Sequence, residues 1–193
     1  DTLKPLAKAD KEKLGYQLDM PEKGEEICVL TTNYGTIRMR FFPDAAPKAV
    51  YSFKSLALSG YYDGVTFHRV IDDFMIQGGD PEGTGMGGPG YSIKGEFSHN
   101  GFKNDLLHTK GVLSMARTMV PDSAGSQFFI MHANAPHLDG DYAAFGKLTE
   151  GEDVLDKIAT CDTDWNDRPL QPQVMKTVTV ETFDVDYDEP ETL

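Results

Sequence analysis

Short runs of alternating hydrophobic and polar residues recur along the chain and are typical of half-buried strands. From Thr36 to Phe41, for example, polar and apolar side chains alternate strictly, and Val174 to Val180 alternates again. Residues 33–35, Asn-Tyr-Gly, supply a hairpin turn before the first of these runs. Together the runs predict strands at Ile27–Thr32, Thr36–Phe42, Thr66–Ile71, Phe74–Gly78, Gly111–Ala116, Gln127–Met131, Ala143–Leu148 and Val174–Val180.

Two segments have helical spacing instead. Pro47 suits the first turn of a helix, and apolar residues then recur on one face from Val50 to Leu58, before Gly60 ends it. A second helix is expected from Gly151 to Thr160. Many strands with only two helices predict a mainly β fold, in which a closed all-β core is capped by the helices.

The 193 residues, of which 39% are hydrophobic, are enough for one domain with a substantial core. We expect an N-terminal arm at residues 1–25, with weak helical character at 7–18. A single domain is expected at 26–183 and a frayed acidic tail at 184–193. No stretch approaches ~18 uninterrupted apolar residues, so we expect no membrane span.

The charge balance narrows the range of partners. Thirty-one acidic residues against 18 basic ones give a net charge of −13, which repels phosphate backbones and makes nucleic acid an unsuitable partner. Cys28 and Cys161 lie far apart and outside any Cys-x-x-Cys pair, so we expect buried free thiols. With no apolar leader in the sequence we expect a cytoplasmic monomer, although the first residue, Asp1, leaves a removed leader open.

Several motifs suggest chemistry that their context excludes. Residues 83–88 fit a dinucleotide-binding fingerprint by letter, but Pro89-Gly90 follows at once and no helix can begin there, which leaves a loop that needs positive φ values. The five histidines lack metal-pair spacing, and we expect no metal or cofactor. His68 is expected to be a hydrogen-bonded histidine in or near the core. Neither Ser123 nor Ser126 forms the nucleophile elbow of a serine hydrolase.

The run from Val65 to Gly79 carries the most informative chemistry. It places a lone arginine, Arg69, between aromatic and apolar residues, with Phe74 and Gln77 just beyond. An apolar surface beside one fixed cation suits an apolar ligand with an adjacent amide group that the cation can bind. The run offers no activated nucleophile and no carboxylate pair, so it does not suit hydrolysis.

This run also resembles the first signature of the cyclophilin family of peptidyl-prolyl cis-trans isomerases. Residues 67–71 and 74–80 follow that signature, and Gly125–Ile130, Leu138–Gly140 and Phe145-Gly146 match later ones. The resemblance spans about residues 26–183. It implies an eight-stranded antiparallel barrel closed at each end by a helix.

The resemblance also implies roles for particular residues. Arg69 is similar to the family's catalytic arginine, Gln77 to the glutamine that orients it, and Phe74 to a pocket wall beside them. The implied substrate-binding residues are Met75, Ala116, Arg117, Gln127, Phe129, Leu138, His137 and Tyr142. Met75, Phe129 and Leu138 would form the walls of the proline pocket together with Phe74. Three positions depart from the best-known members, which have tryptophan at His137, histidine at Tyr142 and asparagine at Arg117. We therefore expect only weak binding of cyclosporin.

The implied activity is rotation about Xaa-Pro bonds in proline-containing peptides and unfolded protein chains. The barrier to rotation is about 18–20 kcal/mol because the amide bond has partial double-bond character. Twisting breaks that resonance and leaves a lone pair on the nitrogen, which a guanidinium can stabilise without cofactor or covalent intermediate. Two alternatives stay open, namely a non-catalytic module that binds proline peptides and a holdase-type chaperone.

Overall fold

The computed structural model describes residues 25–181, and all structural statements refer to this part of the chain. The expected helical stretch at 7–18 and the acidic tail at 184–193 lie outside the described residues. No helix within 25–181 is long and apolar enough to cross a bilayer. Both cysteines are free, with Cys28 buried as expected and Cys161 half-buried.

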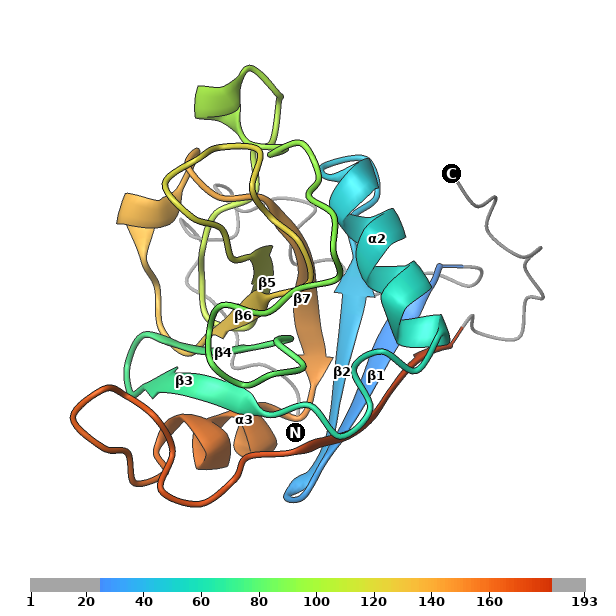
Figure 1. Cartoon of the computed structure of the whole chain (residues 1–193). Coiled ribbons are helices and arrows are strands. Elements are labelled where there is room, and N and C mark those ends of the chain that lie inside the picture. The colour runs from blue at the N-terminus through green and yellow to red at the C-terminus, as the bar shows by residue number, and fades with distance from the viewer. Residues whose placement is uncertain (1–24, 182–193) are drawn as a thin grey trace, which may run out of the picture.

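Eight strands form one antiparallel sheet, and each predicted strand is found with ends shifted by at most two residues (Figure 1). The order across the sheet is β3-β4-β6-β5-β7-β2-β1-β8. The strands are β1 (Ile27–Thr32), β2 (Gly35–Phe41), β3 (Phe67–Ile71), β4 (Met75–Gly78), β5 (Val112–Met115), β6 (Phe128–Met131), β7 (Ala144–Glu150) and β8 (Met175–Glu181). The period-2 pattern therefore identified the elements correctly.

The expected closed barrel is found only in part, because the sheet is curled without a continuous ladder between its two edge strands. One bridge, Thr66 to Val174, joins the β3 edge to the β8 edge. Farther along β3, the N–H of Val70 donates to the carbonyl of Asp167 at 2.8 Å. The N–H of Val70 is thus bonded to a loop and not to β8, and the pairing between the two edge strands does not continue past this point.

The two predicted helices are present. Helix α2 (Pro47–Leu58) begins with proline in its first turn and is followed by Gly60, whose φ of +77° suits glycine beyond a helix end. Helix α3 (Glu152–Ala159) follows β7 directly and has two acidic residues in its first turn, which favours the helix dipole. In Figure 1, α2 lies beside β1 and β2, whereas α3 lies below β3.

Both helices pack on one buried core. The Phe53 ring of α2 stacks on Tyr62 at 5.0 Å and meets Phe128 of β6 edge-on at 5.2 Å between ring centroids. From α3, Leu155 and Ile158 are fully buried in the same cluster. The inward-facing residues of all eight strands complete it.

A second apolar cluster lies on the opposite face of the sheet. Successive side chains of a strand point to opposite faces, so Met75 and Phe129 face away from the core that Ile76 and Phe128 enter. Loop residues such as Leu106, Ala135 and Leu138 cover this cluster, and Leu138 belongs to the short helix η3 (Pro136–Leu138). The predicted functional residues gather along its margin.

Candidate active site

The register of four neighbouring strands brings the predicted site residues into one row. Arg69 of β3 pairs with Gln77 of β4, Gln77 pairs with Phe129 of β6, and Phe129 pairs with Ser114 of β5. Directly opposed residues of antiparallel strands share a face and lie about 5 Å apart. A cation, an amide and an aromatic ring from distant parts of the sequence therefore lie side by side on the outer face.

The Arg69 side chain is exposed, and its guanidinium has no hydrogen bond or ion pair to any described residue. Arg38 of β2 differs, because it pairs with Glu181 at 2.6 Å and with Glu150 at 3.5 Å. The donors of Arg69 are therefore available to a ligand.

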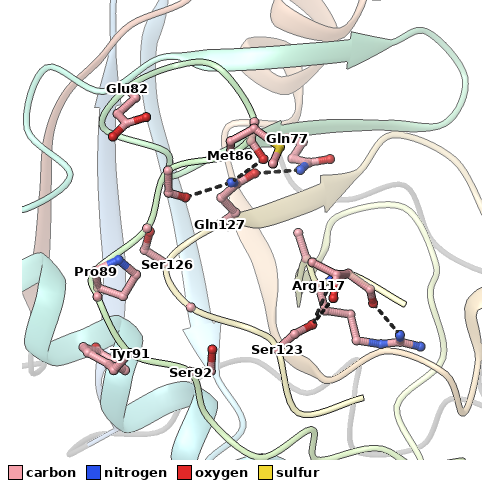
Figure 2. A pocket seen from close by; sticks show the side chains of 17 residues that line it. Gln77, Glu82, Met86, Pro89, Tyr91, Ser92, Arg117, Ser123, Ser126 and Gln127 are labelled. Atoms are coloured by element: carbon pink, nitrogen blue, oxygen red, sulfur yellow. Dashed lines mark hydrogen bonds between the residues drawn. The ribbon is translucent and has the colours of Figure 1, made fainter. Parts of the chain in front are cut away.

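The amide of Gln77 is oriented by a second glutamine. Its Nε2 donates to Oε1 of Gln127 at 3.0 Å, and Nε2 of Gln127 in turn donates to the carbonyls of Gly85 and Gly87, both at 3.0 Å (Figure 2). Because both donors of Gln127 are used on this loop, the two glutamines hold each other in one orientation. The resemblance placed Gln127 near the substrate, and the structure shows that its side chain also positions Gln77.

Asp80 holds the glycine-rich loop in shape. Its carboxylate accepts hydrogen bonds from the backbone N–H groups of Glu82, Thr84, Gly85 and Gly87. Burial disfavours the charged carboxylate, but these donors outweigh it and lower its pKa. No helix follows this loop, and Gly85 has a φ of +87°, as its sequence predicted.

The four predicted pocket walls belong to one cluster beside Arg69. Met75, Phe129 and Leu138 are buried and Phe74 is half-buried. His137 is exposed and lies against Phe74, with 5.9 Å between ring centroids and planes tilted by 31°. The structure thus brings together the walls that the resemblance implied, with His137 at their rim.

Behind Phe129 lies a buried hydrogen-bonded chain that the sequence did not indicate. Nε2 of His108 lies 2.9 Å from Oγ of Ser114, and its Nδ1 lies 3.1 Å from Oδ1 of Asp139. The His108 ring stacks on Phe129 at 6.0 Å, and Tyr142 meets Phe129 edge-on at 5.8 Å. Burial lowers the pKa of His108 although Asp139 opposes this, so the ring is neutral at pH 7.

The order aspartate, histidine and serine resembles a hydrolase triad, but its location excludes that role. Ser114 is 0% exposed and His108 1%, so no substrate reaches the hydroxyl. The hydrogen bonds to Asp139 and Ser114 instead hold the His108 ring in place, and that ring fixes the ring of Phe129.

The guanidinium of Arg117 is engaged by neighbouring residues, although Arg117 also lines a cavity beside the site. Its guanidinium lies between the rings of Phe97 and Tyr142, 4.8 and 4.6 Å from their centroids, and donates to the carbonyls of Asp141 and Thr118. The neighbouring Ala116 uses its N–H on the carbonyl of Gln127 at 3.0 Å. Arg117 and Tyr142 therefore connect two loops beside the site, which their residue types alone did not predict.

A cavity of about 670 Å³ adjoins this region (Figure 2). Gln77 and Gln127 form one wall, and the glycine-rich loop forms another. Ala116, Arg117 and Ser123 contribute from the loop that follows β5. An extended segment of peptide can enter this space beside the row of Arg69, Gln77 and Phe129. No group of three or more His, Cys, Asp or Glu side chains within 25–181 is placed to hold a metal ion.

Comparison with known proteins assigns the family. The model of the family described as cyclophilin type peptidyl-prolyl cis-trans isomerase/CLD matches residues 27–180. This chain is a cyclophilin. It is 47% identical over 152 residues to peptidyl-prolyl cis-trans isomerase CYP18-1 of Arabidopsis thaliana, covering 78% of this chain and 93% of that protein.

Longer and solved relatives complete the comparison. The chain is 42% identical over 179 residues to peptidyl-prolyl cis-trans isomerase-like 2 of Cryptococcus neoformans, which covers 89% of this cyclophilin but only 31% of that longer protein. A crystal structure of a cyclophilin type peptidyl-prolyl cis-trans isomerase from Cryptosporidium parvum superimposes with a TM-score of 0.76 at 35% identity, over 82% of this chain and 98% of that one. The shared family extends over nearly all of the described residues.

Proposed function

We propose that this cyclophilin catalyses cis-trans isomerisation of Xaa-Pro bonds in peptides and unfolded protein chains. The observation that carries the proposal is the unpartnered guanidinium of Arg69, which lies in one row with Gln77 and Phe129. The ligand class is supported by the Cryptosporidium parvum relative, which was also crystallised in the presence of the dipeptide Ala-Pro (TM-score 0.75, 36% identity). Catalysis here consists of binding the twisted amide better than either planar isomer.

In this mechanism the proline ring rests against Phe74, Met75, Phe129 and Leu138 while the preceding carbonyl rotates. As the C–N bond twists, resonance is lost and the nitrogen gains a lone pair. Arg69 donates to that lone pair, and the interaction grows only as the twist develops. Gln77, held by Gln127, orients the guanidinium and the peptide.

A site of this kind can supply the rate acceleration that prolyl isomerisation requires. Shortening the reaction from tens of seconds to milliseconds takes about four decades of rate, or on the order of 5–6 kcal/mol. Removing one preorganised donor to a developing charge costs about 2.7–4 kcal/mol in other enzymes. One charged donor and fixed orientation of the substrate together account for the difference.

The test is Arg69→Ala, with the rate of prolyl isomerisation in a short Xaa-Pro peptide as the readout. We expect kcat/KM to fall by about 10²–10³-fold, because the donor to the twisted nitrogen is lost. Arg69→Lys should recover little, since lysine keeps the charge but not the planar fork. Arg38→Ala is the matched control, because Arg38 is bound by Glu181 and lies outside the row.

Two results would favour the other functions, and a third would refute the mechanism. Saturable peptide binding by the wild type without rate acceleration would identify a binding module. Suppression of aggregation that persists fully in Arg69→Ala would favour a holdase. An unchanged isomerisation rate in Arg69→Ala would refute the mechanism proposed for that arginine.

A further inference from the structure

A second cavity, of about 430 Å³, lies beside Arg69 and is lined by His68, Arg69, Gln77, Thr84, Gly85, Asn166 and Arg168. Gln77 and Gly85 line both this cavity and the one of about 670 Å³. The two spaces therefore adjoin along a shared wall. Asn166 and Arg168 come from the loop before β8, which no sequence motif connected with the site.

Backbone hydrogen bonds hold this loop in place. The carbonyl of Asp167 accepts from Val70, the residue after Arg69, at 2.8 Å. Oδ1 of Asp164 accepts from the N–H groups of Asn166 and Arg168 at 2.8 and 3.1 Å. The loop is thus attached directly to β3 at the position of the functional arginine, and its geometry does not depend on a ligand.

Arg168 keeps donors for a ligand. Its Nη1 donates to the carbonyl of Gly83 at 2.7 Å, which fixes the direction of the side chain. Its Nε and Nη2 have no partner among the described residues. A guanidinium held at one nitrogen and free at the others is preorganised to bind an oxyanion through two parallel hydrogen bonds.

The charge of the cavity is positive although the chain as a whole carries −13. Two arginines line it, and no carboxylate is among the described residues that do. His68 is buried as expected, but the hydrogen bond expected of its ring is not found, because the buried Nδ1 has no partner among the described residues. Burial lowers the pKa of His68; Asp80 opposes this and the two arginines add to it, so the ring is neutral at pH 7.

We propose that this cavity binds an acidic side chain of the substrate, an Asp or Glu close to the proline, with Arg168 as the residue that selects it. The inference rests on the proposed function, because Arg69 is the donor to the prolyl nitrogen and Arg168 lines the same cavity. Arginine matches a carboxylate in geometry as well as charge. The cyclophilin would therefore prefer proline sites with a neighbouring acidic residue, despite its own negative surface.

The experiment compares peptide pairs that differ only by Glu or Gln at one position within three residues of the proline. At one or two adjacent positions we expect the Glu peptide to have a kcat/KM about 3–10-fold higher at low salt. That preference should shrink in 0.5 M salt, because exposed ion pairs are screened. In Arg168→Gln the ratio of the Glu-peptide rate to the Gln-peptide rate should fall to about one, and Arg168→Lys should keep part of the preference.

Arg38→Gln serves as the control and should keep the full preference, since it removes the same charge from a residue of β2 that lines neither cavity. Equal rates for Glu and Gln peptides at every position, or a preference that survives Arg168→Gln, would overturn the inference. Turnover of the Gln peptides by the wild type reports on the proposed isomerase activity alone, so the two claims fail separately.

A binding measurement gives a readout that does not depend on turnover. Trp165 is the only tryptophan of the chain, precedes Asn166 directly and is 90% exposed. Its fluorescence should change as a Glu peptide binds. The apparent affinity should fall to that of the Gln peptide in Arg168→Gln, whereas identical affinities of the wild type for both peptides would count against the site.

Discussion

At the scale of single residues, the arginines of this cyclophilin differ in how many partners their guanidinium groups already have. Arg117 donates to two carbonyls and lies between two aromatic rings. Arg38 is held by two glutamates, whereas Arg69 has no partner among the described residues. The sequence shows where the charges are but not which are already bound. The resemblance implied substrate binding at both Arg69 and Arg117. The Arg117 side chain lines the cavity of about 670 Å³ with its donors already engaged, whereas the donors of Arg69 remain available.

Removal of His108 should loosen the packing of Phe129, one wall of the proposed proline pocket. In His108→Ala, Oγ of Ser114 loses its ring partner and the stacked face of Phe129 is left against a void. We expect the free energy of unfolding to fall by about 2–4 kcal/mol, with a matching drop in kcat/KM as Phe129 becomes mobile. Urea denaturation and the isomerisation assay measure the two effects.

His99→Ala is the control for that substitution. His99 is 67% exposed and pairs with Asp141 at 2.8 Å, so its loss should cost less than about 0.5 kcal/mol. An equal decrease in the free energy of unfolding for the two variants would show that the buried contacts of His108 stabilise the fold no more than an exposed ion pair does.

At the scale of elements, the alternation of polar and apolar residues predicted the strands well. It could not predict which distant segments form hydrogen bonds with one another. The strand ends agree within two residues because a period of two depends only on neighbouring side chains. The end of the ladder at Val70 depends on a carbonyl of Asp167, far away in the sequence. The same holds for the site, since Arg69 and Gln77 lie in a recognisable run, whereas His108 and Arg168 reach it from segments without a motif.

Strand β7 carries a buried lysine whose removal should stabilise the protein. Lys147 is 4% exposed, and its Nζ donates to the carbonyl of Lys110 at 3.0 Å. Burial lowers its pKa from 10.5 to about 8. The protonated form is therefore less stable in the fold than in the unfolded chain, at a cost of about 3 kcal/mol below pH 8.

Lys147→Met should raise the free energy of unfolding at pH 7 by about 1–3 kcal/mol, since it removes this cost but also loses the lysine's hydrogen bonds. From pH 8 to 10.5 the unfolded chain binds more protons than the fold, so the wild type gains stability and the difference between the proteins closes. Urea denaturation across this range measures it. Lys157→Met, at an exposed position of α3, should show no such trend.

At the scale of the whole molecule, the curled sheet has one weak line, where the edges of β3 and β8 approach each other. The N–H groups of Phe67 and Met175 are bonded there to Gln173 and Val65, both at 2.9 Å, beside the single bridge. The β1–β2 ladder, by contrast, pairs six residues of each strand without a register shift. Local opening should therefore begin along this line.

Native-state hydrogen exchange measures this difference. The amides of Phe67 and Met175 should exchange at least about tenfold faster than the protected amides of the β1–β2 ladder, because fewer hydrogen bonds must break together. Uniform protection around the sheet would mean that the line is as cooperative as the ladders.

The wall formed by Gln77 and Gly85 faces two cavities at once. A peptide that fills both cavities has to pass over this wall, so its length decides how many of the lining residues it contacts. A peptide too short to reach Arg168 would show no preference for Glu over Gln. The preference should appear once the peptide is long enough to reach that side chain.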